Sequence, residues 1–235
     1  VTVSGAQTTG DGGAFNNSGT LVISNSTISG NSANTFGGGI YNNGNLDIFS
    51  TSIFGNNAGD QRYGNHGGYG GATFNKGTLR ISNSNISGNN ADYGGALFNS
   101  YLSVSLLVSN STFSNNNANF GSVIYNDKIL TVINSTLAGN TSVSSNWGAI
   151  SNHDTLNIAN TIIANNINLD YSGGGTVNLI GSSASANNLV TQSGLSWATT
   201  KTSAEINLGP LQDNGGPTFT MALGTGSVAI GTGNS

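Results

Sequence analysis

Cysteine is absent from this chain of 235 residues, and several other residue types are scarce. Without cysteine the chain cannot form disulfide bonds or thiolate metal sites, which excludes the disulfide-stapled class of small secreted domains. Charged residues make up 6% of the chain, against about 25% in a typical soluble domain. The five basic residues and the net charge of −4 provide no patch that would neutralise a run of phosphates. We therefore expect no nucleic-acid partner.

Long hydrophobic runs are also missing. No stretch approaches the roughly 18 consecutive apolar residues of a membrane-spanning helix, and no basic amphipathic face suggests binding to a membrane surface. We therefore predict no direct membrane insertion. The chain has 36 Gly and 2 Pro, yet hydrophobic residues make up 35% and recur regularly. This regularity favours a buried core over disorder.

Three segments recur along the chain in a fixed order, in steps of 24 to 33 residues. The first has two small residues, an aliphatic residue, an aromatic residue and Asn, as in 38–42 and 95–99. The second alternates apolar and polar residues, as in 46–48, which is the period of a half-buried strand. The third has the pattern Asn-Ser-Thr-Ile-x-x-Asn, as in 25–31. Three short strands per repeat are predicted.

A strand-only repeat of this length cannot bury its apolar side alone, so each coil must stack on the next. We therefore predict an all-β fold, a right-handed parallel β-helix, which is a single-stranded β-solenoid of about 25 residues per coil. An antiparallel sandwich or a propeller are the alternatives. Propeller blades repeat at about 40 residues, and hairpin folds would not return the same residue to the same phase. One domain is predicted over 1–235, with regular coils over 1–166 and less regular coils and a terminal segment over 167–235.

Stacked coils place equivalent residues in columns, and Asn is expected to form two of them. Asn tolerates left-handed backbone angles at turns, and its amide can bond to the amides above and below. The first predicted column follows the aromatic position and consists of Asn16, Asn42, Asn75, Asn99, Asn126 and Asn152. The second opens the third segment and consists of Asn25, Asn83, Asn110, Asn134 and Asn160. Both columns are interpreted as structural.

One coil carries an insertion, and this insertion is the candidate ligand site. Insertions in solenoids become loops, and loops carry function more often than coils do. Asp92 and Tyr93 follow the equivalent turn of the next coil, so we expect them beside the loop. The candidate site consists of Asp60, Arg62, Tyr63, His66, Tyr69, Asp92 and Tyr93. The alternative is a set of solvated loop residues.

Aromatic residues also recur at two positions of the repeat. One column stands just before the small residues and consists of Phe36, Tyr69, Tyr93, Phe120 and Trp147. The other consists of Phe15, Tyr41, Phe74, Phe98 and Tyr125, and strand alternation places it opposite the inward aliphatic residues. Exposed rings would bind glycan faces or a partner protein, whereas rings that stack on each other would shield the turns. The stacked, structural interpretation is favoured.

The acidic residues are scattered singly along the chain. Polysaccharide lyases and hydrolases need two carboxylates about 5 to 10 Å apart, or a calcium-binding acid cluster with a base. Asp47 and Arg80 instead share the outward phase of neighbouring coils, which predicts a cross-strand ion pair. We therefore predict no catalytic residues, no cofactor and no metal site.

The repeats and the tail resemble known bacterial surface proteins. The segments Gly-Gly-Ile at 38–40 and Phe-Ser-Asn-Asn at 113–116 resemble the repeats of polymorphic outer membrane proteins, which are autotransporter-type surface proteins. The tail at 208–231 is similar to the end of choice-of-anchor Q proteins, although Met221 and Gly231 stand where that family usually has His and Asp. The resemblance implies a right-handed β-helix and export to the cell surface, and it assigns no activity.

We therefore expect a non-catalytic structural or adhesive module, extracellular or on a bacterial cell surface, with surface glycans or proteins of a host or neighbouring cell as partners. The first residues already read as strand, so no signal peptide is expected in this chain. Both ends of the solenoid are expected to expose strand edges without a helical cap, which predicts end-to-end self-association into filaments. A glycan-binding or polysaccharide-degrading β-helix that uses the inserted loop and the aromatic columns is the alternative.

Overall fold

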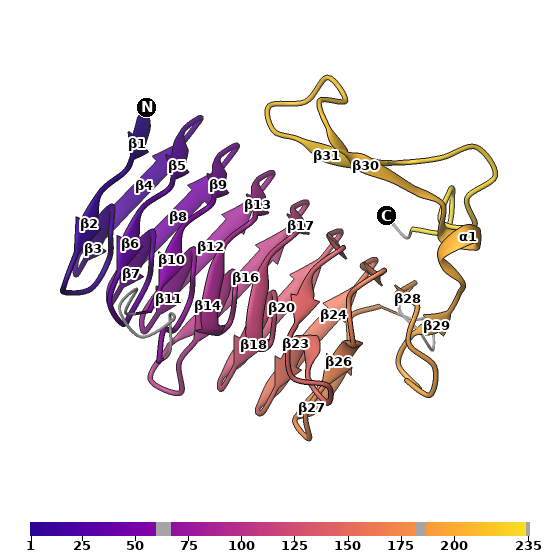
Figure 1. Cartoon of the computed structure of the whole chain (residues 1–235). Coiled ribbons are helices and arrows are strands. Elements are labelled where there is room, and N and C mark those ends of the chain that lie inside the picture. The colour runs from indigo at the N-terminus through magenta and orange to yellow at the C-terminus, as the bar shows by residue number, and fades with distance from the viewer. Residues whose placement is uncertain (60–66, 182–186, 234–235) are drawn as a thin grey trace.

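Short strands separated by tight turns build each coil. The turn between the second and third repeat segments has a φ of 47–50°, a conformation that Asn adopts more readily than most residues. The residues at this turn are Asn25, Ser50, Asn83, Asn110, Asn134 and Asn160. The computed structural model describes residues 1–59, 67–181 and 187–233. Within them the coils stack into a parallel β-solenoid of about seven turns, which confirms the predicted fold class (Figure 1).

Four parallel sheets run along the solenoid, and two of them flank the Asn turn described above. Sheet D precedes this turn and contains β4 (Thr20–Ser24), β8 (Asn45–Phe49), β12 (Thr78–Ser82), β16 (Ser105–Ser109), β20 (Ile129–Ile133), β24 (Thr155–Ala159) and β27 (Thr176–Leu179). Sheet A follows it and contains β1 (Thr2–Ser4), β5 (Thr27–Ser29), β9 (Ser52–Phe54), β13 (Asn85–Ser87), β17 (Thr112–Ser114), β21 (Thr136–Ala138), β25 (Ile162–Ala164), β28 (Leu189–Val190) and β29 (Thr199–Thr200).

The other two sheets complete the coil. Sheet B contains β2 (Gln7–Thr8), β6 (Ser32–Ala33), β10 (Asn57–Ala58), β14 (Asn90–Tyr93), β18 (Asn117–Phe120) and β22 (Thr141–Ser142). Sheet C contains β3 (Phe15–Asn17), β7 (Ile40–Asn42), β11 (Thr73–Asn75), β15 (Leu97–Asn99), β19 (Ile124–Asn126), β23 (Gly148–Asn152) and β26 (Leu169–Ser172). A regular coil therefore has four strands, and the prediction of three is wrong by the strand of sheet B. The sequence does not indicate these strands, because they are four residues long at most and show no alternation of apolar and polar residues.

Equivalent aliphatic residues lie in register inside the solenoid. The predicted leucine column pairs strand by strand through sheet D, and the Ile or Val two residues later forms a second column beside it. Leu46, Leu79, Leu130 and Leu156 are completely buried. Sheet A adds a third column at the middle residue of each strand, such as Ile28. The core is therefore a set of stacked aliphatic columns.

A ladder of buried Asn side chains closes the turn from sheet C to sheet D. Each Nδ2 donates to the Oδ1 of the next coil at 2.7–3.0 Å. The members are Asn17, Asn42, Asn75, Asn99, Asn126 and Asn152. The first predicted column is thus correct except at Asn16, which is exposed. Because β3 pairs Phe15 with Ile40, Asn17 is the residue in register with Asn42.

A second ladder of Asn side chains lies at the last residue of the third segment, whereas the predicted column lies at its first residue. Each Nδ2 again donates to the next Oδ1, at 2.9–3.0 Å. The members are Asn31, Asn56, Asn89, Asn116, Asn140 and Asn166. The predicted residues Asn25, Asn83, Asn110 and Asn134 are exposed instead, and Asn160, which donates to Asn134 at 3.0 Å, is half-buried. The left-handed turn directs their side chains outward, whereas the Asn that follows sheet A faces the core.

A buried carboxylate ends this second ladder. Asn166 donates its Nδ2 to Asp170 Oδ1 at 2.9 Å. The other oxygen of Asp170 accepts the backbone N–H groups of Thr191 and Gln192 at 2.7 and 2.8 Å and the Thr191 hydroxyl at 2.7 Å. Because every hydrogen bond of the ladder runs in the same direction, the last amide needs a pure acceptor, and Asp170 provides it.

The C-terminal part of the chain covers the last coils. Trp197 is 8% exposed and packs on the apolar core, where its ring meets Tyr171 edge to face at 5.2 Å. Helix α1 (Ser203–Ile206) then buries Ile206 on the outer face of sheet A. The expectation of an uncapped C-terminal end is therefore wrong for the core, although β26 and β27 remain the last strands of their sheets. No helix in the described ranges is long and apolar enough to cross a membrane.

The chain returns over the solenoid as a hairpin. The strands β30 (Leu208–Gln212) and β31 (Thr220–Leu223) pair antiparallel. The hairpin lies along the outer side of sheet A, above the middle coils (Figure 1). The less regular terminal segment predicted after 166 therefore folds back on coils that are more than 100 residues away in the sequence.

The ladders should carry much of the stability. Asn89→Ala removes the Oδ1 that accepts from Asn56, which leaves the buried backbone N–H of Asn56 without an acceptor and takes one hydrogen bond from its Nδ2. We expect a loss of about 3 kcal/mol in the free energy of unfolding, measured by urea titration. The control is Asn83→Gly at the exposed turn, where φ is 49° and glycine fits. Equal losses from the two substitutions would contradict this assignment of the ladder.

Candidate functional site: the aromatic face and its pocket

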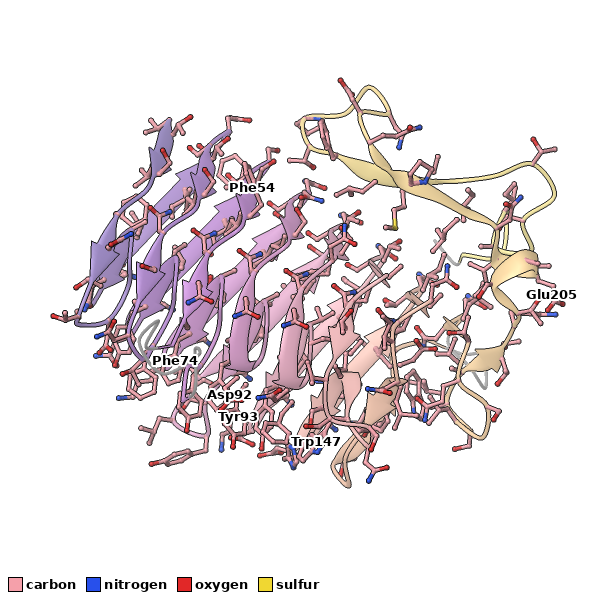
Figure 2. The ribbon with its side chains drawn as sticks, in the orientation of Figure 1. Phe54, Phe74, Asp92, Tyr93, Trp147 and Glu205 are labelled. Atoms are coloured by element: carbon pink, nitrogen blue, oxygen red, sulfur yellow. The ribbon has the colours of Figure 1, made fainter. Side chains whose placement is uncertain are left out.

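The aromatic residues gather on one side of the solenoid, along the corner between sheets B and C. We define this aromatic face as the rings of Phe36, Tyr69, Tyr93, Phe120 and Trp147 in one column and Tyr41, Phe74, Phe98 and Tyr125 in the other. Figure 2 shows Phe74, Tyr93 and Trp147 along this side. Phe15 was predicted to join the second column, but it pairs with Ile40 and packs against the core. His153 extends the column at its other end, 4.8 Å from the Tyr125 ring.

Glycines between the two columns bring the coils close enough for the rings to stack. A Cβ at Gly71 would lie 2.2 Å from the carbonyl oxygen of Gly95 in the next coil, so no side chain fits there. Within the second column, the centroids of adjacent rings are 5.2–5.5 Å apart and the ring planes are within 7° of parallel. The inner rings therefore cover each other's faces. This geometry supports the structural interpretation, since a sugar stacks on a free face.

Three residues of the predicted loop site lie together on this face. The Tyr69 and Tyr93 rings stack at 4.9 Å, and Asp92 accepts the backbone N–H of Gly67 at 3.1 Å. Asn119 of the next coil also donates its Nδ2 to Asp92. The expectation that Asp92 and Tyr93 lie beside the inserted loop is thus confirmed at Gly67 and Tyr69. Asp60, Arg62, Tyr63 and His66 lie outside the described residues.

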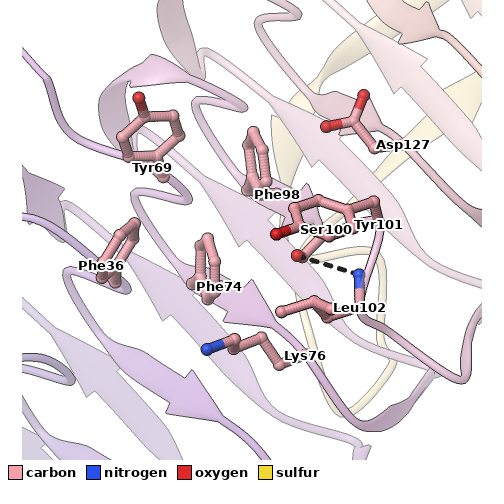
Figure 3. A pocket seen from close by; sticks show the side chains of 9 residues that line it. All are labelled: Phe36, Tyr69, Phe74, Lys76, Phe98, Ser100, Tyr101, Leu102 and Asp127. Carbon is pink, nitrogen blue, oxygen red and sulfur yellow. Dashed lines mark hydrogen bonds between the residues drawn. The ribbon is translucent and has the colours of Figure 1, made fainter.

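A pocket of about 280 Å³ opens on the aromatic face (Figure 3). Its lining consists of Phe36, Tyr69, Phe74, Lys76, Phe98, Ser100, Tyr101, Leu102 and Asp127. The turn after Asn99 forms one wall, where Tyr101 is 68% exposed and the Ser100 hydroxyl accepts the Leu102 N–H at 3.2 Å. The pocket thus combines apolar walls with one ammonium and one carboxylate group.

Sequence reasoning singled out Tyr69 but missed the other side of this pocket. A signal was present, because five residues separate Asn99 from the next strand, whereas two separate Asn75 from its own. This second, shorter insertion places Tyr101 and Leu102 beside the rings. Lys76 and Asp127 follow the ladder residues Asn75 and Asn126 directly, so the ladder positions their side chains.

Partial burial shifts the pKa values of acidic groups on this face. Burial raises the pKa of Tyr125 to about 12, helped by Asp127, Tyr93 and Tyr69. Burial also raises the pKa of the Asp127 carboxyl, with His153 acting in the opposite direction and Asp154 in the same one. The pKa of Tyr93 is raised by burial, by Asp92 and by Tyr69. The neutral forms of these groups are therefore favoured.

The carboxylates are distributed among structural roles. Among the described residues that line the pocket, Asp127 is the only carboxylate, so these residues do not form the pair used in glycoside hydrolysis. The predicted ion pair is confirmed, with 3.4 Å between Arg80 Nη1 and Asp47 Oδ1. Glu205 accepts the N–H of Thr202 in the capping box of α1. In the part of the chain that the structure describes, no three His, Cys, Asp or Glu side chains come together in a way that could hold a metal ion.

Comparison of the chain with protein-family models, curated proteins and solved structures found no match. The likeness of its repeats and tail to bacterial surface proteins therefore rests on the motifs in its own sequence.

The raised pKa of Tyr125 predicts a pH-dependent stability. Because its folded pKa is about 12 and a free tyrosine titrates at about 10, folding favours the neutral phenol. The contribution of the neutral Tyr125 phenol to the free energy of unfolding is present in full below pH ~10 and is lost as the pH rises toward 12. We expect an ultraviolet titration of the folded protein to show a late tyrosine step that Tyr125→Phe removes. Tyr101→Phe is the control, and a late step that disappears there instead would contradict the assignment.

The stacked rings should stabilise the fold at their centre. Phe98 is 8% exposed and contacts the rings of Tyr69, Phe74 and Tyr125. We expect Phe98→Ala to cost about 3 kcal/mol in the free energy of unfolding, from lost burial and a cavity. The exposed neighbour Tyr101→Ala should change it by less than about 0.5 kcal/mol. A Phe98→Ala variant as stable as the parent would show that the rings are not packed as described.

Proposed function

We propose that this protein is a non-catalytic β-solenoid that serves as a structural or adhesive module on a bacterial cell surface. The observation that carries this proposal is the continuity of the two Asn ladders from the first coils to Asn152 and Asn166. Bending or separating any two coils would break buried hydrogen bonds in both ladders at once. Such a chain is suited to hold surfaces at a fixed spacing rather than to close around a substrate.

The sequence motifs support a location outside the cell. The repeats and the tail resemble polymorphic outer membrane proteins and choice-of-anchor Q proteins, and we propose kinship with such surface proteins. The chain has no cysteine, and its polarity rests on neutral Asn, Ser and Thr side chains. Its fold is thus held by hydrogen bonds and apolar burial, which do not depend on the redox state of the surroundings.

Polysaccharide degradation has less support than a structural or adhesive role. Asp127 has no second carboxylate beside it among the described residues of its pocket, while Asp47 forms an ion pair and Asp170 ends a ladder. The aromatic face offers ring edges rather than ring faces along most of its length. The described residues of the pocket therefore offer a substrate neither a carboxylate pair nor a row of stacking platforms.

End-to-end self-association remains a proposal with a changed basis. Trp197 covers the apolar end of the core, so a head-to-tail contact would rely on strand edges such as those of β26 and β27. Backbone pairing alone supports a weaker contact than pairing together with apolar burial. A single solenoid is accordingly the favoured working unit, with filaments as the alternative.

The non-catalytic role is tested by incubating the protein with a panel of neutral and uronate-containing polysaccharides. We expect no new reducing ends and no unsaturated uronates above the level of a heat-inactivated sample. The variants Asp127→Asn in the pocket and Asp213→Asn in the exposed hairpin loop form a matched pair. Product release that Asp127→Asn abolishes and Asp213→Asn preserves would overturn the proposal in favour of an enzyme.

A further inference from the structure

A groove lies between the C-terminal hairpin and the outer face of sheet A, on a different side of the solenoid from the aromatic face. Its volume is about 650 Å³, more than twice that of the aromatic pocket. The lining consists of Thr27, Ser52, Phe54, Asn85, Ser87, Asn115, Pro210, Leu211 and Phe219. Figure 2 shows Phe54 next to the hairpin, far from Phe74 and Tyr93.

The hairpin is held over the sheet at its tip and within its own loop. Asn85 donates its Nδ2 to the Phe219 carbonyl, and the Thr218 hydroxyl donates to the Asn83 carbonyl, both at 3.4 Å. Inside the loop, Asn214 donates to the carbonyl and the hydroxyl of Thr220 at 2.9 and 3.0 Å. The hairpin is thus fixed over the sheet by its tip, and the groove lies between the two.

The floor of the groove presents neutral polar side chains in rows. Parallel pairing aligns Thr27 with Ser52 and Asn85, while Phe54 lies in register with Ser87 in the adjacent row. Among the residues that the structure describes, no hydrogen bond occupies the side chains of Thr27, Ser52 and Asn115. The side chains of Thr27, Ser52 and Asn115 on the floor are therefore available to donate and accept hydrogen bonds with a ligand.

Two phenyl rings flank these polar groups. Phe54 is 44% exposed on the sheet, and Phe219 is 53% exposed on the hairpin. Neither ring stacks on another ring of the described residues, in contrast to the rings of the aromatic face. Their faces are therefore free to contact the C–H face of a ring-shaped ligand.

Charge narrows the ligand class. None of the described residues that line the groove is acidic or basic, so they offer no counter-ion to a uronate, a phosphate or an amine. Burying an unpaired charge costs much more than burying a hydroxyl that finds a partner. Free ring faces beside neutral hydroxyl and amide groups fit a ligand that carries many hydroxyl groups and apolar ring faces.

We propose that this groove binds a neutral oligosaccharide, with Phe54 and Phe219 as stacking platforms and Thr27, Ser52 and Asn115 as hydrogen-bond partners. The inference deepens the adhesive role proposed above and rests on it. An extended peptide fits less well, because the backbone groups of the floor already pair within the parallel sheet and only side chains face the groove. Neutral oligosaccharides are therefore the ligand class that we propose for the adhesive module.

The test is calorimetric titration of the intact protein with neutral tetrasaccharides of glucose, mannose and N-acetylglucosamine, and with tetragalacturonate. We expect saturable binding of at least one neutral probe and weaker binding of the charged one. Phe54→Ala and Phe219→Ala should each lower the affinity about ten-fold, because each removes a stacking platform. Ser52→Ala should lower it by a smaller factor while leaving both rings in place.

The control is Phe49→Ala, which removes an exposed ring of sheet D that does not line the groove. Its affinity should equal that of the parent protein. The inference is overturned if no neutral probe binds, or if binding survives in the Phe54→Ala, Phe219→Ala double variant. Either result leaves the proposed non-catalytic structural role unaffected. Product release from a polysaccharide would instead refute that role, and the titration would still decide whether the groove binds an oligosaccharide.

Discussion

Parallel backbone hydrogen bonding between successive coils is the constraint on which the other features of this protein depend. It brings equivalent residues into register, so a polar side chain at a repeated turn position lies next to the equivalent side chains of the coils above and below. An Asn amide satisfies this arrangement because it donates on one side and accepts on the other. The resulting ladders have a direction, and a directional ladder needs a defined end. Asp170 supplies that end for one ladder, which explains why a carboxylate is buried so deeply in a chain with few charges.

The same stacking decides which aromatic rings are free to bind a ligand. Rings at repeated positions, such as Phe74 and Phe98, stack on each other and give up their faces to neighbouring coils. Phe54 has only serines in register, Ser29 and Ser87, and neither Phe54 nor Phe219 stacks on another ring of the described residues, so both keep their faces. Repetition therefore produces stability, while departures from the repeat leave ring faces exposed. The pocket beside Tyr101 lies where the repeat carries an insertion, and the groove lies where the non-repetitive hairpin covers regular coils.

Much of the fold was predictable from the sequence, because it follows from the spacing of equivalent residues in successive repeats. Less of the candidate site was predictable. The leucine column, the outward Asp47 and Arg80 pair and most of the first Asn ladder follow from counting residues from coil to coil. The second ladder was misplaced because the sequence does not say which Asn of the third segment has left-handed backbone angles. The short strands of sheet B were missed because they are too short to alternate. At the site, Tyr69, Asp92 and Tyr93 were identified from the insertion, whereas Asp127 carries no local signal.

By itself, the sequence determined that this chain stacks coils into a solenoid, since a fixed phase of apolar and Asn residues can be buried in no simpler way. Only the tertiary structure decided how the ladders end and where the tail lies. Asp170 meets Asn166 and Thr191, and Phe219 meets Asn85, a residue 134 positions earlier in the chain. Contacts of this kind have no period, so their partners are set by how the last coils and the hairpin pack in space. The groove beneath the hairpin is therefore a property of the folded chain and not of its repeat.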